Sequence, residues 1–144
     1  MIRRYPRGAA FHEAGHAVVG HFLGLEVHDI RINDEDESGH INFITKEQTC
    51  AEHATRLFAG LAAENIWKAK PEHMSGAGDI VDFIELARTK GLSDEERDEL
   101  RIQAYERANS ILLAHKSLVE AVADRLMERG QMDGVEFMRL MRGP

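Results

Sequence analysis

The residues whose types and spacing could do chemistry lie in the segment Phe11-His12-Glu13-Ala14-Gly15-His16-Ala17. In a helix, at about 100° per residue, the side chains of His12 and His16 lie one turn apart on one face. Glu13 lies about a quarter-turn away, beside that face. This H-E-x-x-H pattern lets two neutral imidazoles bind one zinc ion while the carboxylate reaches a metal-bound water. Two histidines do not fix a metal alone, so the chain must supply at least one more ligand.

The flanks of this segment favour a metal site over a helix that merely carries two surface histidines and an acid. Small and apolar residues precede the motif at 9–11 and follow it at 17–19, so the helix is predicted to be buried. Buried histidine and glutamate are costly without partners. Gly15 costs about 1 kcal/mol relative to alanine inside a helix, which predicts that another segment approaches the backbone there.

The residues around the motif do not by themselves identify the third ligand. His21 fails the metzincin spacing, and it lies about 140° around the helix from His16 and about 180° from His12. A glutamate from a later helix, Glu52 or Glu64, is one solution, and Glu64 stands among small apolar residues. Asp79, where a glycine-rich loop meets a helix, is another, although an aspartate there is also an ordinary helix N-cap. Spacing leaves Glu64 and Asp79 open.

The elements that must position these residues follow from periodicity and from turn residues. The metal helix is predicted over 9–23, with Gly24 ending it. Runs at 27–32 and 41–45 flank an acidic turn at 33–39 and predict a hairpin. The remaining expectations are a helix over 47–70 ended by Pro71, a loop over 74–78, a helix over 79–90 stopped by Gly91, and helices begun by capping boxes at Ser93/Glu96, Ser117/Glu120 and Asp133/Glu136, with a break near His115 and an end at Gly130.

Composition limits the class of protein. The 144 residues are 43% hydrophobic and 30% charged, which is typical of a single globular domain, here taken as residues 1–144. A net charge of −7 argues against a nucleic-acid partner. A single cysteine, Cys50, excludes an internal disulfide and favours a reducing compartment. Without a membrane-spanning segment, a signal peptide or a phosphate-binding loop, we expect a cytoplasmic protein with no ATPase module of its own.

Three groups of residues together resemble the peptidase domain of FtsH-type ATP-dependent zinc metalloproteases, in order and in spacing. They are Phe11 to Ala17, Gly60-Leu61-Ala62-Ala63-Glu64, and Ser75-Gly76-Ala77-Gly78-Asp79-Ile80 followed by Glu85-Leu86-Ala87-Arg88. Ala104 to Ala108 and Leu126 to Asp133 are similar to the closing helices of that domain, so the resemblance covers about 9–142. It implies that Asp79 is the third zinc ligand, and it places Glu64 behind a ligand, which it orients.

The chain also departs from the family pattern. The loop before Asp79 is one residue shorter, which leaves Asp82 as a fallback ligand, and Leu61 stands where the family usually has arginine. The stretch after Gly91 is much shorter, and the ATPase and membrane segments are absent. The resemblance therefore implies the metal site more strongly than ATP-driven degradation.

We expect a mainly α (α+β), zincin-like helical domain with one small β-hairpin next to the metal helix. The expected function is that of a stand-alone zinc metallopeptidase in which Glu13 is the general base toward a zinc-activated water. Its substrate would be a peptide or an unfolded protein, and its partners a second copy of the chain or a separate ATPase. The alternative is a zinc-stabilised interaction or regulatory module with little proteolytic activity. For oxyanion stabilisation the candidates are four unranked histidines: His28, His40, His53 and His73.

Overall fold

The computed structural model describes residues 5–33, 38–44, 46–70 and 77–143. Helices dominate it, and a small antiparallel sheet lies against one of them, which confirms the predicted fold class. In chain order the elements are α1 (Arg7–Phe22), β1 (Glu26–Ile32), β2 (Gly39–Ile44), α2 (Cys50–Trp67), α3 (Ala77–Thr89), α4 (Asp94–Ala114), α5 (Lys116–Arg129), β3 (Gln131–Asp133) and α6 (Gly134–Met141).

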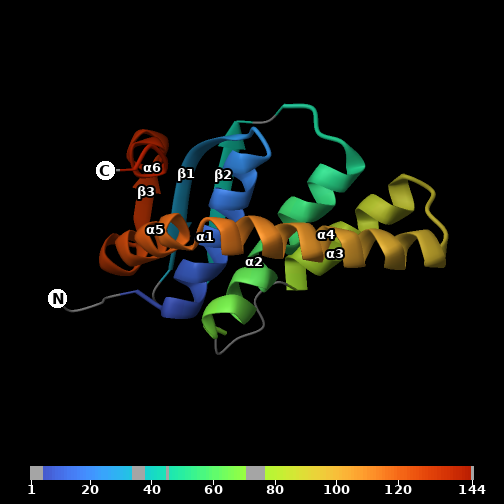
Figure 1. The fold of residues 1–144 in the computed structure, drawn as a ribbon, viewed down its shortest axis with the longest axis horizontal. Helices are drawn as coiled ribbons and strands as arrows, with labels where there is room; N and C mark the ends of the chain where they lie inside the picture. Colours follow the sequence, from blue (N-terminus) through green and yellow to red (C-terminus); the bar gives the residue numbers. More distant parts are fainter. Residues whose placement is uncertain (1–4, 34–37, 45, 71–76, 144) are drawn as a thin grey trace.

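The helix α1 is the centre of the molecule. It packs against α2 and α5, and β1 lies against it, while α4 packs across α2 (Figure 1). Every residue from Gly8 to Gly20 is buried, so α1 has no solvent-facing stripe in this stretch. A Cβ on Gly15 would lie 2.6 Å from the Cβ of Ala63 and 2.8 Å from the carbonyl oxygen of Ala59. The close approach predicted at Gly15 is therefore confirmed, and the approaching segment is α2.

The boundaries of α2 differ from the predicted helix over 47–70. Thr49 accepts a hydrogen bond from the backbone N–H of Glu52, whose carboxylate accepts one from the N–H of Thr49, so a capping box starts the helix at Cys50. The helix ends at Trp67 because Lys68 adopts a left-handed conformation with φ of 51°. Pro71, predicted to end the helix, lies outside the described residues, as does the 74–76 part of the predicted loop.

The other predicted helix starts are correct in two of three cases. Ser93 and Glu96 form the full capping box of α4, and the Asp133 carboxylate accepts from the N–H of Glu136 at the start of α6. The box at Ser117 and Glu120 is wrong: α5 begins at Lys116, directly after His115, with no side-chain cap. The carboxylate of Glu120 instead accepts a hydrogen bond from the indole N–H of Trp67, 2.9 Å away. The Glu120 carboxylate is thus used in a contact with α2 and does not complete a capping box with Ser117.

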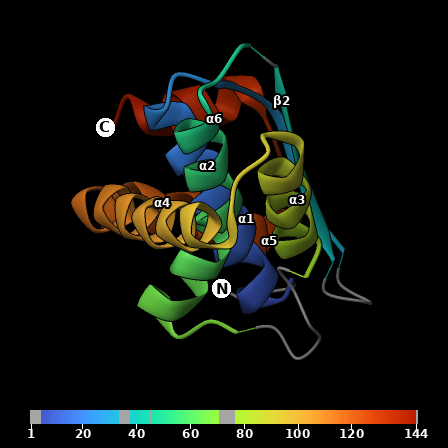
Figure 2. The ribbon, with the colours of Figure 1, turned by 90° about the vertical axis from the view of Figure 1, so that its right-hand side faces the viewer.

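The sheet contains the predicted hairpin and one further strand. Its order is β2-β1-β3, all antiparallel, with Ile32 opposite Gly39 and Ile30 opposite Met132. The 34–37 part of the predicted acidic turn lies outside the described residues. The strand β3 was not predicted, because three residues are too few for an alternating pattern. Figure 2 shows β2 at one edge of the sheet. The central strand β1 packs against α1.

No helix in the described parts of the chain is long and apolar enough to cross a membrane.

Candidate metal centre

Three side chains from two distant helices meet at one point. The Nε2 atoms of His12 and His16 are 3.1 Å apart, and the Oδ2 atom of Asp79 lies 3.1 Å from the first and 3.0 Å from the second. The histidines come from α1, and Asp79 is the third residue of α3. Asp79 is therefore inside the helix, so the interpretation of Asp79 as an ordinary N-cap is wrong.

Both imidazoles are held from behind by their other ring nitrogen. The Nδ1–H of His12 donates to the carboxylate of Glu64, and that of His16 donates to the backbone carbonyl of Arg56 over 2.9 Å. Both acceptors belong to α2. In the neutral tautomer that these bonds favour, the Nε2 lone pair of each ring is directed to the point where Asp79 arrives. Glu64 thus lies at the Nδ1 atom of His12, on the other side of the ring from Asp79.

Gly60 allows α2 to come this close to the two histidines. A Cβ at this position would lie 2.5 Å from the Nε2 of His12 and 2.6 Å from the Nε2 of His16. Any larger residue would therefore occupy the space in front of both nitrogens. In the sequence, Gly60 stands out only as part of the family resemblance. The available signal was the small residues at 59, 60, 62 and 63, which are typical of a close helix–helix contact.

Glu13 is buried next to this point, where the first residue of β2 covers it. A Cβ on Gly39 would lie 2.6 Å from the Oε2 of Glu13, so there is no room for a side chain between the backbone of the strand and the carboxylate. Burial raises the pKa of Glu13, and the positive charges of His16 and His12 partly oppose that rise. The carboxylate is thus shielded from bulk water but remains next to the histidines.

The pKa values of His12 and Asp79 reflect how closely these charged groups pack. Burial by itself lowers the pKa of His12, but the hydrogen bonds to Asp79 and Glu64 and the charge of Glu13 raise it to about 10. Burial raises the pKa of Asp79, yet the hydrogen bonds and charges of the two histidines hold it well below its usual range. The imidazoles and the carboxylates thus stabilise one another's charged forms.

The residues fit a divalent metal ion. His12, Glu13 and His16 each offer a ligand atom within 4.8 Å of the other two, and all three are buried. Two imidazole nitrogens and a carboxylate oxygen are typical zinc ligands with bonds of about 2.0–2.2 Å. Three atoms that are 3.0–3.1 Å apart can all reach one ion at such distances. Three protein ligands also match the number found in catalytic zinc sites, which keep a position for water.

The other candidates from the sequence lie elsewhere or have other partners. The carboxylate of Glu52 caps α2, and the ring of His21 contacts Phe22 and Phe137. Asp82, the fallback ligand, is exposed one turn further along α3. Of the four histidines considered for oxyanion stabilisation, His40 is the one whose charge acts on Glu13, although its side chain is exposed. His73 lies outside the described residues.

Comparison with known proteins gives one consistent group of relatives. The chain is 29% identical, over 94% of its length, to ATP-dependent zinc metalloprotease FtsH 3 of Symbiobacterium thermophilum. It is 27% identical over 99% of its length to FtsH of Chloroflexus aggregans, and 28% identical over 98% to FtsH 2 of Sphaerobacter thermophilus. No family model matches the chain.

These similarities extend over nearly all of the chain, but not over the relatives. The chain spans 28–29% of the length of these three proteins, less than a third. The resemblance to the FtsH peptidase domain is thereby confirmed at the level of the whole chain.

Proposed function

We propose that this FtsH-like chain is a zinc metallopeptidase that hydrolyses peptide bonds, with His12, His16 and Asp79 as metal ligands and Glu13 as general base. The observation that carries the proposal is the meeting of two Nε2 atoms and one carboxylate oxygen within 3.1 Å, beside a buried glutamate. The names of the three relatives support zinc and proteolysis, because each is a zinc metalloprotease.

In this proposal the chain supplies the positioning and the proton transfers. A zinc ion bound here supplies Lewis acidity, which lowers the pKa of a water molecule and polarises a carbonyl group. The Glu13 carboxylate accepts the proton of the attacking water and later donates it to the leaving amine. Glu64 and the Arg56 carbonyl keep both imidazoles in the required tautomer and orientation.

The substrate is proposed to bind as an extended strand. β2 is a border strand of the sheet, and its first residue, Gly39, lies against Glu13. An added peptide strand would find unpaired backbone groups along β2 and would place its own carbonyls next to the general base. This arrangement favours a peptide or an unfolded protein as the substrate.

The remaining parts of the proposal concern context. We take residues 1–144 as a single peptidase domain that acts in a reducing, cytoplasmic environment, since Cys50 is the one cysteine and it is free. A second copy of the chain or a separate ATPase would be its partner, by analogy with the ATP-dependent relatives.

The decisive experiment compares the zinc-loaded protein with Glu13→Gln on fluorogenic peptides and on unfolded casein. The variant should bind zinc as the parent does and lose at least about a hundredfold in kcat, because a general base typically contributes 10²–10⁴. Metal analysis of both proteins is the control. If Glu13→Gln retains the activity of the parent, Glu13 is not the base.

A zinc-stabilised interaction module is the second candidate. The observation that favours it is the short connection between α3 and α4, which leaves only 90–93 where the sequence resemblance implies a long segment near the site. This candidate predicts a zinc-loaded, folded protein that cleaves neither casein nor peptides at any pH. Cleavage that Glu13→Gln abolishes would exclude it.

A further inference from the structure

The side chain of Arg56 is charged and lies beside the proposed metal centre, but it has no role in the proposed mechanism. It extends from α2 toward the sheet, where its Nε–H donates to the Oε1 of Gln48 over 3.1 Å. Its guanidinium carbon lies 5.3 Å from the centre of the Phe43 ring, within the range of a cation–π contact. These two contacts fix the guanidinium group between α2 and the end of β2.

Among the described residues, the charge of Arg56 has no close counterion. Arg31, Arg88, Arg97, Arg125 and Arg129 each have a carboxylate oxygen within 4.0 Å. Arg56 is half-buried, yet in the described part of the chain it forms no such pair. Burial lowers the pKa of its guanidinium, and the more distant charges of Asp79 and Asp82 only partly oppose this effect. A partly buried cation without a paired anion is costly, and a bound anion would relieve that cost.

The partner of Arg56 also lacks an acceptor. The Nε2 atom of Gln48 is buried, and among the described residues it has no hydrogen-bond partner. The Oε1 atom of the same amide is occupied by Arg56, so the assignment of oxygen and nitrogen is fixed by the bond. One hydrogen bond thus joins Arg56 to Gln48, and within the described residues the Nε2 atom of Gln48 has no acceptor and the guanidinium has no carboxylate partner. An oxygen ligand with more than one lone pair is the group that would complete both.

The position of this pair links it to the metal centre. The backbone carbonyl of Arg56 accepts the hydrogen bond from the Nδ1–H of His16. The guanidinium group therefore belongs to a residue that directly contacts a proposed ligand. Phe43, under the guanidinium, is the residue that a Cβ on Gly20 of α1 would meet. The negative charge of Asp79 raises the pKa of the Arg56 guanidinium, against the effect of burial. Arg56 and Gln48 therefore lie next to the border strand on which the substrate is proposed to bind.

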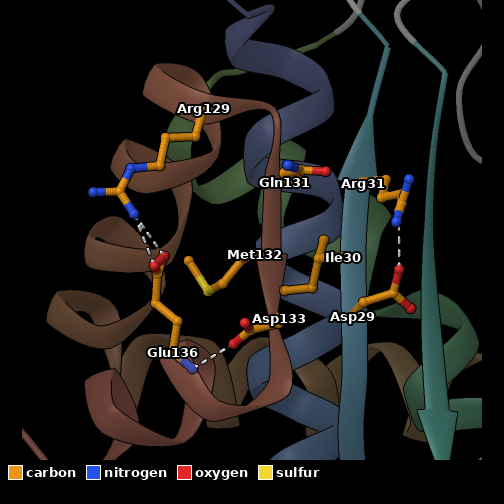
Figure 3. A pocket seen from close by; sticks show the side chains of 8 residues that line it. All are labelled: Asp29, Ile30, Arg31, Arg129, Gln131, Met132, Asp133 and Glu136. Carbon is orange, nitrogen blue, oxygen red and sulfur yellow. Dashed lines mark hydrogen bonds and ion pairs between the residues drawn. The ribbon is translucent and has the colours of Figure 1, made fainter.

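The cavity drawn in Figure 3 differs from this pair, because its arginines have carboxylate partners. It has a volume of about 360 Å³ between β1, β3 and α6, and it contains two arginines. Arg31 is paired with Asp29, Arg129 is paired with Glu136, and Asp133 accepts from the N–H of Glu136. Both arginines of this cavity therefore already have a carboxylate partner, unlike Arg56.

We propose that Arg56 and Gln48 bind a carboxylate of the peptide substrate, so that peptides with a carboxylate close to the scissile bond are preferred. The inference rests on the proposed peptidase function. Two sources present the same pair of oxygens: the side chain of an aspartate or glutamate, and the free carboxyl end of a short peptide. The guanidinium group and the amide N–H would each donate to one carboxylate oxygen.

Binding of labelled peptides to the zinc-loaded Glu13→Gln variant tests this without hydrolysis. One sequence is used in four forms, with glutamate or glutamine near the centre and with a free or an amidated carboxyl end. One carboxylate form should bind at least about tenfold tighter than the form that lacks both carboxylates. Whichever carboxylate gives the gain identifies the source. Adding Arg56→Gln should reduce that preference to less than about twofold, and Arg56→Lys should keep part of it.

Several results would overturn the inference. They are equal binding of all four peptides, no binding of any peptide, and an Arg56→Gln variant that keeps the full preference or weakens all four forms equally. If Arg56→Gln does not fold, Gln48→Leu takes its place. That variant should lose at least about threefold of the preference, because the amide N–H would no longer donate to the carboxylate. An unchanged preference in Gln48→Leu would count against the proposal.

The outcomes for the two proposals are separable. A carboxylate preference in binding without any cleavage by the parent protein contradicts the peptidase function and leaves the carboxylate site standing. Cleavage that depends on Glu13 but is equally efficient for carboxylate and amide peptides contradicts only the carboxylate site.

Discussion

Two regions of this molecule bring acids and bases together, with opposite consequences. At the metal centre, His12, Glu13, His16 and Glu64 are each at most 7% exposed, and α1 and α2 surround them. At the cavity between β3 and α6, the side chain of Arg129 is 55% exposed, and its partner Glu136 is 18% exposed. Both regions hold opposite charges within hydrogen-bond distance. Asp79 at the metal centre is 22% exposed and reaches solvent as Glu136 does, but of these groups only Arg129 is more than half exposed.

The difference in burial determines what each region contributes. Exposed ion pairs are screened by water and typically contribute about 0–1 kcal/mol to stability. Buried charges lose their hydration, and their mutual attraction often fails to compensate for that loss. We therefore expect substitutions and a bound cation to change the free energy of unfolding most at the metal centre. The cavity is a region where charge substitution changes little.

Gly60→Ala should produce the largest loss of zinc binding. The added methyl group would lie in front of both Nε2 atoms, so we expect zinc affinity to fall by more than about a hundredfold, beyond the usual effect of changing a group that supports a ligand. Titration with zinc in competition with a chelator measures this.

Gly78→Ala is the matched control, because a Cβ there meets nothing within 4 Å. It should bind zinc as the parent does. Equal zinc affinity for the two alanine variants would mean that the metal does not bind in front of His12 and His16.

Removal of zinc should destabilise the whole domain. At a free zinc concentration of 100 times Kd, a metal that binds only the folded state contributes about 2.7 kcal/mol. We expect chelation to lower the melting temperature by several degrees, and re-addition of zinc to restore it. A melting temperature that is the same with and without zinc would indicate that no metal binds to the folded chain.

Glu64→Gln tests the group behind His12. The hydrogen bond from Nδ1 can remain, but the negative charge that strengthens the imidazole as a ligand is lost, so zinc affinity should fall about tenfold to a hundredfold. The same measurement on Glu120→Gln, whose carboxylate accepts from Trp67, is the control and should show no change. An effect of equal size in both would make the role of Glu64 structural.

Arg129→Gln in the cavity should have the smallest effect. It removes an exposed pair with Glu136, so the free energy of unfolding should change by at most about 1 kcal/mol, and zinc affinity should stay the same. Denaturant unfolding measures the first and metal titration the second. A larger loss of stability would contradict the proposed difference between the two regions.

Local patterns predicted those parts of the site that depend on one element. His12 and His16 share a helix face because they are four residues apart, and this holds for any tertiary arrangement of a helix. Gly15 also predicted a close approach from local sequence alone, because the free-energy cost of glycine within a helix does not depend on what the helix packs against. The capping box at Ser93 also formed as predicted, because both of its partners lie within one turn.

Patterns that depend on a partner were less reliable. Spacing left Glu64 and Asp79 open as third ligand, and the resemblance, not the spacing, selected Asp79. The local pattern at Ser117 and Glu120 failed because Trp67 of another helix uses the Glu120 carboxylate. No sequence pattern points to the Arg56 carbonyl as the group that holds His16, since every residue has a carbonyl.

The sequence by itself determined the metal helix, its two histidines on one face, and the hairpin that follows. Only the tertiary structure brought Asp79, 63 residues from His16, to the same point. It also set Gly60 in front of the two Nε2 atoms, and Glu64 and Arg56 behind the rings. The physical reason is the separation along the chain between the residues that interact. Side-chain positions along one helix follow from backbone geometry, whereas contacts between helices depend on how the whole chain buries its apolar surface.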